Sequence, residues 1–143
     1  MPEPTTPVAV VLDNEAVQAL VEPTHPKHRA VLAHVEAVVT GRKRGGATRL
    51  LVPTSVRVEA GWDRTRAEAA VVNRVRIADH VLDAVLTNRA AAVRSRTRVS
   101  VADAHLGVVV QEAAAVGSVV VLTSDPTDVA AASAPASPRI VLV

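Results

Sequence analysis

The sequence predicts an α/β fold, a three-layer α/β/α sandwich around a mainly parallel sheet of about five strands. Two observations support this prediction. Short apolar runs such as "VAVVL" at 8–12 and "VVVLT" at 119–123 are typical of strands that are buried on both faces. Segments with helical spacing stand between such runs, and this alternation favours a parallel sheet with right-handed crossovers. Because the chain has 143 residues, we expect a single domain over 1–143.

The expected elements alternate along the whole chain. Strand segments are expected at 8–12, 49–55, 74–82, 118–125 and 139–143, and helices at 15–21, 25–41, 56–72, 83–96, 100–117 and 126–133.

In the first half, the strand at 8–12 ends at Asp13 and leads into a short helix. The helix at 25–41 is the clearest amphipathic one, because valine and leucine recur at helical spacing and Gly41 supplies a stop. The segment "GRKRGG" at 41–46 is then expected to be a basic, flexible connection to the second strand.

In the second half, the segment at 74–82 alternates apolar and polar residues, which suits a strand with one exposed face. The helix that Ser100 opens is apolar nearly all round, so we expect it to be buried. The fourth strand, "SVVVLTSD", passes directly into the helix that begins at Pro126, and "RIVLV" supplies the last strand.

The composition excludes several kinds of site. Hydrophobic residues make up 49% of the chain, but Phe and Tyr are absent and Trp62 is the single tryptophan. Proteins that stack single-stranded bases on aromatic rings need several such rings, so any nucleic acid must be held by its backbone. The absence of cysteine excludes disulfides, thiolate zinc sites and cysteine nucleophiles.

Charge and hydropathy describe the expected surroundings of the protein. Two of the 16 basic residues are lysine and the others are arginine, which favours bidentate contacts with phosphate. The first residues, "MPEPTTPVAVVLD", lack the basic start and long apolar core of a signal peptide, and apolar runs of about 18 residues are missing. We therefore expect a soluble, cytoplasmic protein that makes no contact with membranes.

Four acids fall where a parallel sheet collects its ligands, at the carboxyl ends of the strands. Asp13 ends the first strand and Glu59 follows the second. Asp103 opens the buried helix, and Asp125 ends the fourth strand. We expect these side chains to converge on one edge of the sheet.

Helix capping is the alternative interpretation of the same acids. Asp125, Pro126 and Asp128 form a good N-cap, N1 and N3 pattern, and Ser100 with Asp103 fits a capping box. Asp13 could cap the first helix. Glu59 is not explained in this way because it lies about one turn inside its helix. Asp103 fits capping poorly as well, because an apolar helix desolvates its carboxylate.

Converging carboxylates raise one another's pKa and are destabilising without a cation. Mg²⁺ and Mn²⁺ are the hard ions that such oxygen ligands suit, so one or two of these ions are the expected cofactor. Thr123 and Ser124 stand close enough in sequence to orient a carboxylate or a water molecule.

The chain resembles the PIN-domain ribonucleases, particularly the VapC-like toxins of toxin–antitoxin modules. The resemblance rests on "VVLD" at 10–13, "VPTSVRVE" at 52–59, "SVADAHLG" at 100–107 and "VLTSDPTD" at 121–128, and it covers essentially the whole chain. It implies a PIN-like fold with Asp13, Glu59, Asp103 and Asp125 as catalytic, metal-binding acids. It also implies accessory roles for Asp128, Thr123 and Ser124. Many relatives carry a small hydroxyl residue after the first acid and Asn in place of Asp125, where this chain has Asn14 and Asp125.

The resemblance further implies a metal-dependent endoribonuclease that hydrolyses RNA phosphodiesters as the toxin of such a module. A small cognate antitoxin and a homodimer are the implied partners. The alternative is a non-catalytic PIN-like module that binds protein or RNA. The arginines that could hold the RNA backbone are Arg42, Arg44, Arg74, Arg76, Arg94, Arg96 and Arg98.

Other chemistries fit the residues less well. A phosphatase with an aspartate nucleophile would need a second Asp where Glu15 stands, and a phosphorelay receiver would need a lysine after its fifth strand. The five histidines, at 25, 28, 34, 80 and 105, match no zinc spacing and are expected to be structural or exposed. Trp62 is expected to be a packing anchor.

Overall fold

A computed structural model describes residues 6–143, and within them five strands form one sheet in which each neighbouring pair is parallel. The strand order is β3-β2-β1-β4-β5. The strands are β1 (Ala9–Leu12), β2 (Arg49–Pro53), β3 (Ile77–His80), β4 (Val119–Thr123) and β5 (Arg139–Leu142). The expected α/β fold with a parallel sheet is confirmed.

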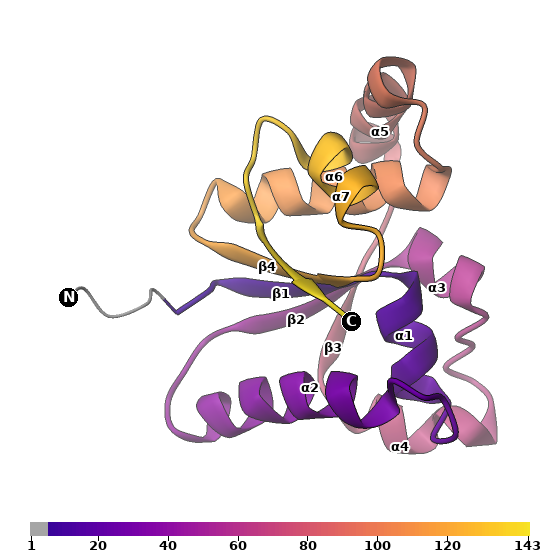
Figure 1. The fold of residues 1–143 in the computed structure, drawn as a ribbon, viewed down its shortest axis with the longest axis vertical. Coiled ribbons are helices and arrows are strands. Elements are labelled where there is room, and N and C mark those ends of the chain that lie inside the picture. The colour runs from indigo at the N-terminus through magenta and orange to yellow at the C-terminus, as the bar shows by residue number, and fades with distance from the viewer. Residues whose placement is uncertain (1–5) are drawn as a thin grey trace.

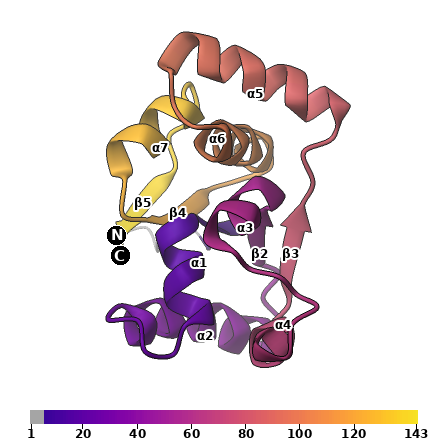
Figure 2. The same ribbon diagram turned by 90° about the vertical axis from the view of Figure 1, so that its right-hand side faces the viewer.

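Helices cover both faces of this sheet and make three layers (Figure 1). The helices are α1 (Asn14–Val21), α2 (His28–Lys43), α3 (Thr54–Ala60), α4 (Ala70–Asn73), α5 (Ala84–Thr97), α6 (Val101–Ala114) and α7 (Pro126–Ser133), with a 3₁₀ turn, η1, at Ala67–Ala69. In Figure 1, α1, α2 and α4 lie below the sheet and α6 and α7 above it, while Figure 2 shows α5 crossing over α6. In the described part of the chain, none of the helices combines the length and apolarity that a membrane span requires.

The strand order creates a topological switch point between β1 and β4. From β1 the chain builds outward to β2 and β3, and it then returns to add β4 and β5 on the other side. The crossovers after β1 and β4 therefore leave toward opposite faces of the sheet. In open α/β sheets, ligands bind in the crevice that this divergence leaves at the carboxyl ends of the strands.

The core is aliphatic, as the composition requires. All residues of β1 and β4 are buried, and α6 is buried from Ala104 to Val110, which confirms the expectation of a buried helix. Strands covered on both faces must be apolar throughout, which explains their unbroken valine and leucine runs. Among the described residues, the buried polar side chains are Asp13, His105, Thr123 and Ser133.

The prediction of one continuous helix at 56–72 is wrong. The chain forms α3 directly after β2, and α3 ends at Ala60 because Gly61 adopts a left-handed conformation with φ of 71°. The Trp62 amide then donates a hydrogen bond to the Arg57 carbonyl, which closes the helix end. Only η1 and α4 restore helical structure before β3. The sequence "EAGWD" carried this signal, since glycine after a helical segment is a common C-terminal cap.

Two other expected boundaries differ. Helix α2 continues through Gly41 to Lys43, so the first half of the expected connection at 41–46 is helical. The Arg42 side chain is also held in place, because its Nε donates to the Thr48 carbonyl at 2.9 Å. The strand expected at 74–82 is reduced to the four residues of β3, and Val81 beyond it is 61% exposed.

Candidate metal centre

Four acids stand around the switch point because of where their elements begin. Asp13 follows β1 and caps α1, and Asp125 follows β4 and caps α7. Asp103 lies in the first turn of α6, and Asp128 lies in the first turn of α7. Figure 2 shows α1, α3 and α7 grouped around the end of α6. Of the four acids expected to converge at the carboxyl edge, Asp13, Asp103 and Asp125 lie near one another, and Asp128 joins them.

Capping describes the local geometry correctly but accounts for only part of it. Asp13 accepts from the Asn14 amide, Asp125 from the Asp128 amide and Ser100 from the Asp103 amide. These bonds explain why α1, α7 and α6 begin where they do. Capping does not explain why the first turns of these three helices lie close together, with their acidic side chains near one another.

Asp13 is the buried member of the set. Asp13 is only 6% exposed. Each of its carboxylate oxygens accepts a short hydrogen bond. The Thr123 hydroxyl donates to Oδ2 at 2.6 Å, and the Asn14 amide donates to Oδ1 at 2.7 Å. Thr123 Oγ1 also accepts from the Asp125 amide at 2.9 Å, so this hydroxyl joins the first acid to the α7 loop. The expected supporting contact is thus made by Thr123; Ser124 is exposed and makes no hydrogen bond of its side chain within the described residues.

Asp103, Asp125 and Asp128 form the tightest group of acids, which we call the carboxylate triad. One carboxylate oxygen from each lies within 4.8 Å of the others. Asp128, expected to be accessory, thus lies within 4.8 Å of Asp103, as Asp125 does. The capping pattern carried this signal, because an N-cap residue and the residue three positions later lie side by side on the first helical turn.

The electrostatics of the triad are those of unneutralised acids. Burial raises the pKa of Asp103 to about 6, and the nearby charges of Asp13, Asp128 and Asp125 add to this rise. The pKa of Asp128 is raised chiefly by its hydrogen bond with Asp125 and by the charge of that carboxylate. All charged groups that shift these two pKa values are carboxylates, so a positive charge at this position would be stabilising.

Glu59 is exposed and, like Asp13, lies outside the triad, so its role as a metal ligand stays a prediction. It is joined to Asp13 through Asn14, whose Nδ2 donates to Glu59 Oε1 at 2.7 Å. Helix α3, which carries Glu59, packs against α1, which carries Asn14. The contact from Asn14 to Glu59 spans 45 positions of the chain, and the sequence pattern did not predict it.

The donor set fits a hard divalent cation. The triad and Asp13 present carboxylate oxygens, and the described residues around them present neither thiolate nor imidazole ligands to the triad. Oxygen ligands of this kind suit Mg²⁺ and Mn²⁺. A bound cation would lower the raised pKa values of Asp103 and Asp128, because its positive charge favours the ionised carboxylates.

Four of the seven arginines proposed to hold RNA lie at the opposite edge of the sheet. Arg42 and Arg44 end α2, and Arg74 and Arg76 precede β3, so they stand at the amino ends of β2 and β3. Arg42 is partly committed to structure, because its Nη1 donates to the Arg76 carbonyl at 3.1 Å. These four arginines are not beside the triad.

The other three arginines are nearer the acids along the chain. Arg94 Nε donates to the Val99 carbonyl, and the Arg96 guanidinium donates to two carbonyls near the end of α7. Arg98 is exposed, with φ of 61°, in the short connection between α5 and α6. Of the seven, Arg98 therefore lies nearest in sequence to Asp103, and RNA binding by this group stays a prediction.

His105 forms a buried contact beside the site. The residue is 0% exposed, and its Nδ1 lies 2.9 Å from the Ser55 hydroxyl. Burial lowers the pKa of His105 to about 4, with a further contribution from the charge of His80, so its ring is neutral at pH 7. Because Ser55 belongs to α3 and His105 to α6, this contact ties the helix of Glu59 to the helix of Asp103.

Trp62 is buried at 4% exposure, and the guanidiniums of Arg57 and Arg64 lie over its ring at 5.4 and 4.2 Å from the centroid. Both arginines also pair with Asp79, at 2.8 and 2.9 Å. The contacts suit a packing anchor, as expected, because the ring is covered by side chains of the same chain.

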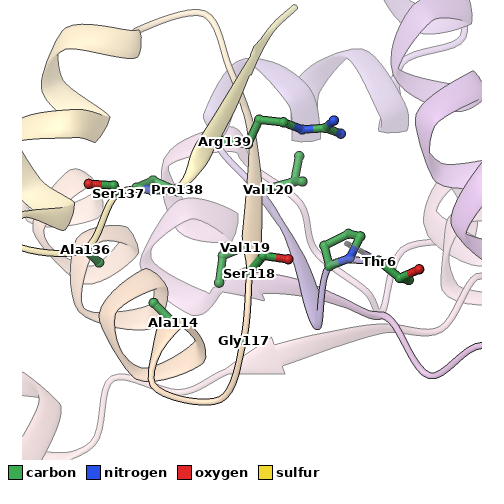
Figure 3. Close-up of a pocket in the computed structure, with 11 residues that line it drawn as sticks. Thr6, Ala114, Gly117, Ser118, Val119, Val120, Ala136, Ser137, Pro138 and Arg139 are labelled. Carbon is green, nitrogen blue, oxygen red and sulfur yellow. The ribbon is translucent and has the colours of Figure 1, made fainter. Parts of the chain in front are cut away.

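A cavity of about 770 Å³ lies at the other edge of the sheet, and Figure 3 shows residues that line it. It opens at the amino ends of β4 and β5, and its lining includes Gly117, Ser118, Pro138 and Arg139. Among the lining residues that the structure describes, Arg139 is the one with a titratable side chain. The described lining residues therefore include no pair of an acidic and a basic side chain.

The search with this sequence found no matching family model and no matching curated protein.

Proposed function

We propose that this protein is a metal-dependent endoribonuclease of the PIN type that hydrolyses RNA phosphodiester bonds. The observation that carries the proposal is the carboxylate triad at the switch point of a parallel sheet, with buried Asp13 beside it. These acids lie at the place where α/β folds bind ligands. Without a cation, the repulsion between their negative charges destabilises the fold, which favours a metal-binding role over capping alone.

The residues divide into two groups by position. Asp103, Asp125, Asp128 and Asp13 would hold Mg²⁺ or Mn²⁺, and Thr123 keeps Asp13 oriented through its 2.6 Å hydrogen bond. Glu59 stands apart with Oε1 held by Asn14, which leaves Oε2 to orient the attacking water and accept its proton. A bound ion supplies neutralisation of phosphate charge and lowers the pKa of water.

The reaction requires no protein nucleophile. The oxygen of a water molecule forms a new bond to phosphorus, and the bond from phosphorus to the leaving ribose oxygen breaks. One water proton passes to Glu59, and the leaving oxygen takes a proton from solvent. The RNA is held by its backbone, because the single tryptophan is covered by arginines.

The cellular role follows from the resemblance to VapC-like toxins. We assign this chain to the toxin component of a toxin–antitoxin module acting in the cytoplasm, with a small cognate antitoxin and a second copy of the chain as partners. Both partners rest on the resemblance alone.

Cleavage of mixed RNA tests the proposed activity. Wild type, Asp13→Asn and Asp103→Asn are incubated with RNA and Mn²⁺ or Mg²⁺, and with chelator. We expect metal-dependent cleavage by wild type, with a loss of about 100-fold in either variant. Glu36→Gln, an exposed α2 residue with the same change of charge, is the matched control and should cleave normally. Equal cleavage by wild type and both Asp variants would identify a contaminant and contradict the proposal.

A further inference from the structure

Asn14 contacts two of the proposed catalytic acids at once. Its backbone amide donates to Asp13 Oδ1 at 2.7 Å, while its side-chain Nδ2 donates to Glu59 Oε1 at 2.7 Å. The first contact uses the main chain, so any residue except proline could make it at this position. The second depends on the asparagine amide and joins the start of α1 to α3.

The amide of Asn14 is itself held in one orientation. Gln18 lies one helical turn further along α1, and its Nε2 donates to Asn14 Oδ1 at 2.9 Å. With the amide oxygen committed to Gln18, the NH₂ group faces Glu59. The three side chains thus form a directional chain of hydrogen bonds from Gln18 through Asn14 to Glu59.

A neutral donor suits this position for an electrostatic reason. Glu59 is exposed and long, so its carboxylate samples many rotamers unless a partner holds it. A lysine or arginine partner would neutralise the carboxylate and repel a cation at the neighbouring triad. An amide orders the carboxylate, keeps its negative charge and leaves the second oxygen available.

We propose that Asn14 is a positioning residue that fixes the Glu59 carboxylate for the proposed hydrolysis, and that Gln18 fixes Asn14. This inference rests on the proposed function. A serine at position 14 would be shorter than asparagine and would not extend as far toward Glu59. Asn14 therefore has a specific role, which is to orient an acid that another helix carries.

Kinetics and a double-mutant cycle test the role of Asn14. Asn14→Ala should lower kcat for RNA cleavage by about tenfold and leave KM for RNA nearly unchanged. In the Glu59→Ala background, Asn14→Ala should have no further effect, because the group that it positions is gone. Gln18→Ala should show a smaller loss that likewise disappears with Glu59. Asn88→Ala, at an exposed position of α5, is the matched control and should behave as wild type.

An NMR measurement tests the contact without relying on activity. In the metal-free protein, the side-chain amide protons of Asn14 should exchange more slowly than those of Asn88, and Glu59→Ala should abolish this protection. Amide protons of Asn14 that exchange as fast as those of Asn88 would overturn the proposal, as would equal loss of kcat on Asn14→Ala in both backgrounds. If wild type does not cleave RNA although the Asn14 contact is present, the proposed function is wrong, and the positioning role is wrong with it. If wild type cleaves RNA and Asn14→Ala cleaves it as well as Asn88→Ala does, only the positioning role is wrong.

Discussion

At the scale of single residues, the ionised Asp103 carboxylate lowers the stability of the metal-free fold, which is not expected of a residue with a purely structural role. Its pKa of about 6 means that the folded protein binds a proton more tightly than the unfolded chain, whose aspartates titrate near the ordinary value of 3.8. Its contribution to stability is therefore most favourable below about pH 4 and is lost as the pH rises through about 6. At neutral pH, without metal, the ionised carboxylate destabilises the fold.

Asp103→Asn should consequently raise the melting temperature of the metal-free protein at pH 7. The shift in pKa corresponds to about 3 kcal/mol, which we reduce to about 1 kcal/mol because the side chain is only half-buried and solvent screens its charge. For a chain of this size the gain is about 3 °C in Tm. At pH 4 the same substitution should change Tm little. Thermal melts at the two pH values check this, and a lower Tm for the variant at pH 7 would mean that Asp103 is a structural acid.

At the scale of elements, the triad depends on how α6 packs against α7, since one helix carries Asp103 and the other carries Asp128. The two helices approach closely at Gly107, where a Cβ atom would lie 2.3 Å from the Ala132 carbonyl oxygen. This glycine is needed for close approach rather than for an unusual φ. The spacing of the acids therefore depends on a residue that lies one turn beyond Asp103 on the same helix.

Gly107→Ala should push the two helices apart and destabilise the protein by about 2 to 3 kcal/mol, measured by urea unfolding. Gly41→Ala is the matched control, because Gly41 lies in α2 with open space around its Cβ position. That substitution should stabilise by about 0.5 to 1 kcal/mol through helix propensity. If the two variants unfold at the same urea concentration, the packing argument for α6 and α7 is wrong.

At the scale of the whole molecule, the parallel α/β architecture could be predicted from the sequence, because strands that are buried on both faces are continuously apolar. The convergence of Asp13, Asp103 and Asp125 could be predicted for the same reason, since carboxyl ends of parallel strands share an edge. Contacts between distant segments could not be predicted: the hydrogen bond from Asn14 to Glu59 joins positions 45 residues apart. The break at Gly61 was missed although "EAGWD" contains a glycine that is typical of a helix end.

Surface charge was the least predictable property. The arginines at 42, 44, 74 and 76 form local clusters in the sequence, yet they stand at the amino edge of the sheet, away from the acids. Exposed residues follow no periodicity that reports which edge they occupy. Their position becomes clear only from the strand directions.

Thermal melting with Mn²⁺ at pH 7 tests most directly the central claim, that the acids at the switch point form a divalent-metal site. At 100 times its dissociation constant, an ion that binds only the folded state stabilises it by about 2.7 kcal/mol, which is about 8 °C for a chain of this size. We predict such a rise for wild type and for the surface control Glu36→Gln, and its loss in Asp103→Asn and Asp125→Asn. A Tm of wild type that does not respond to Mn²⁺, or an equal rise in all four proteins, would contradict the account.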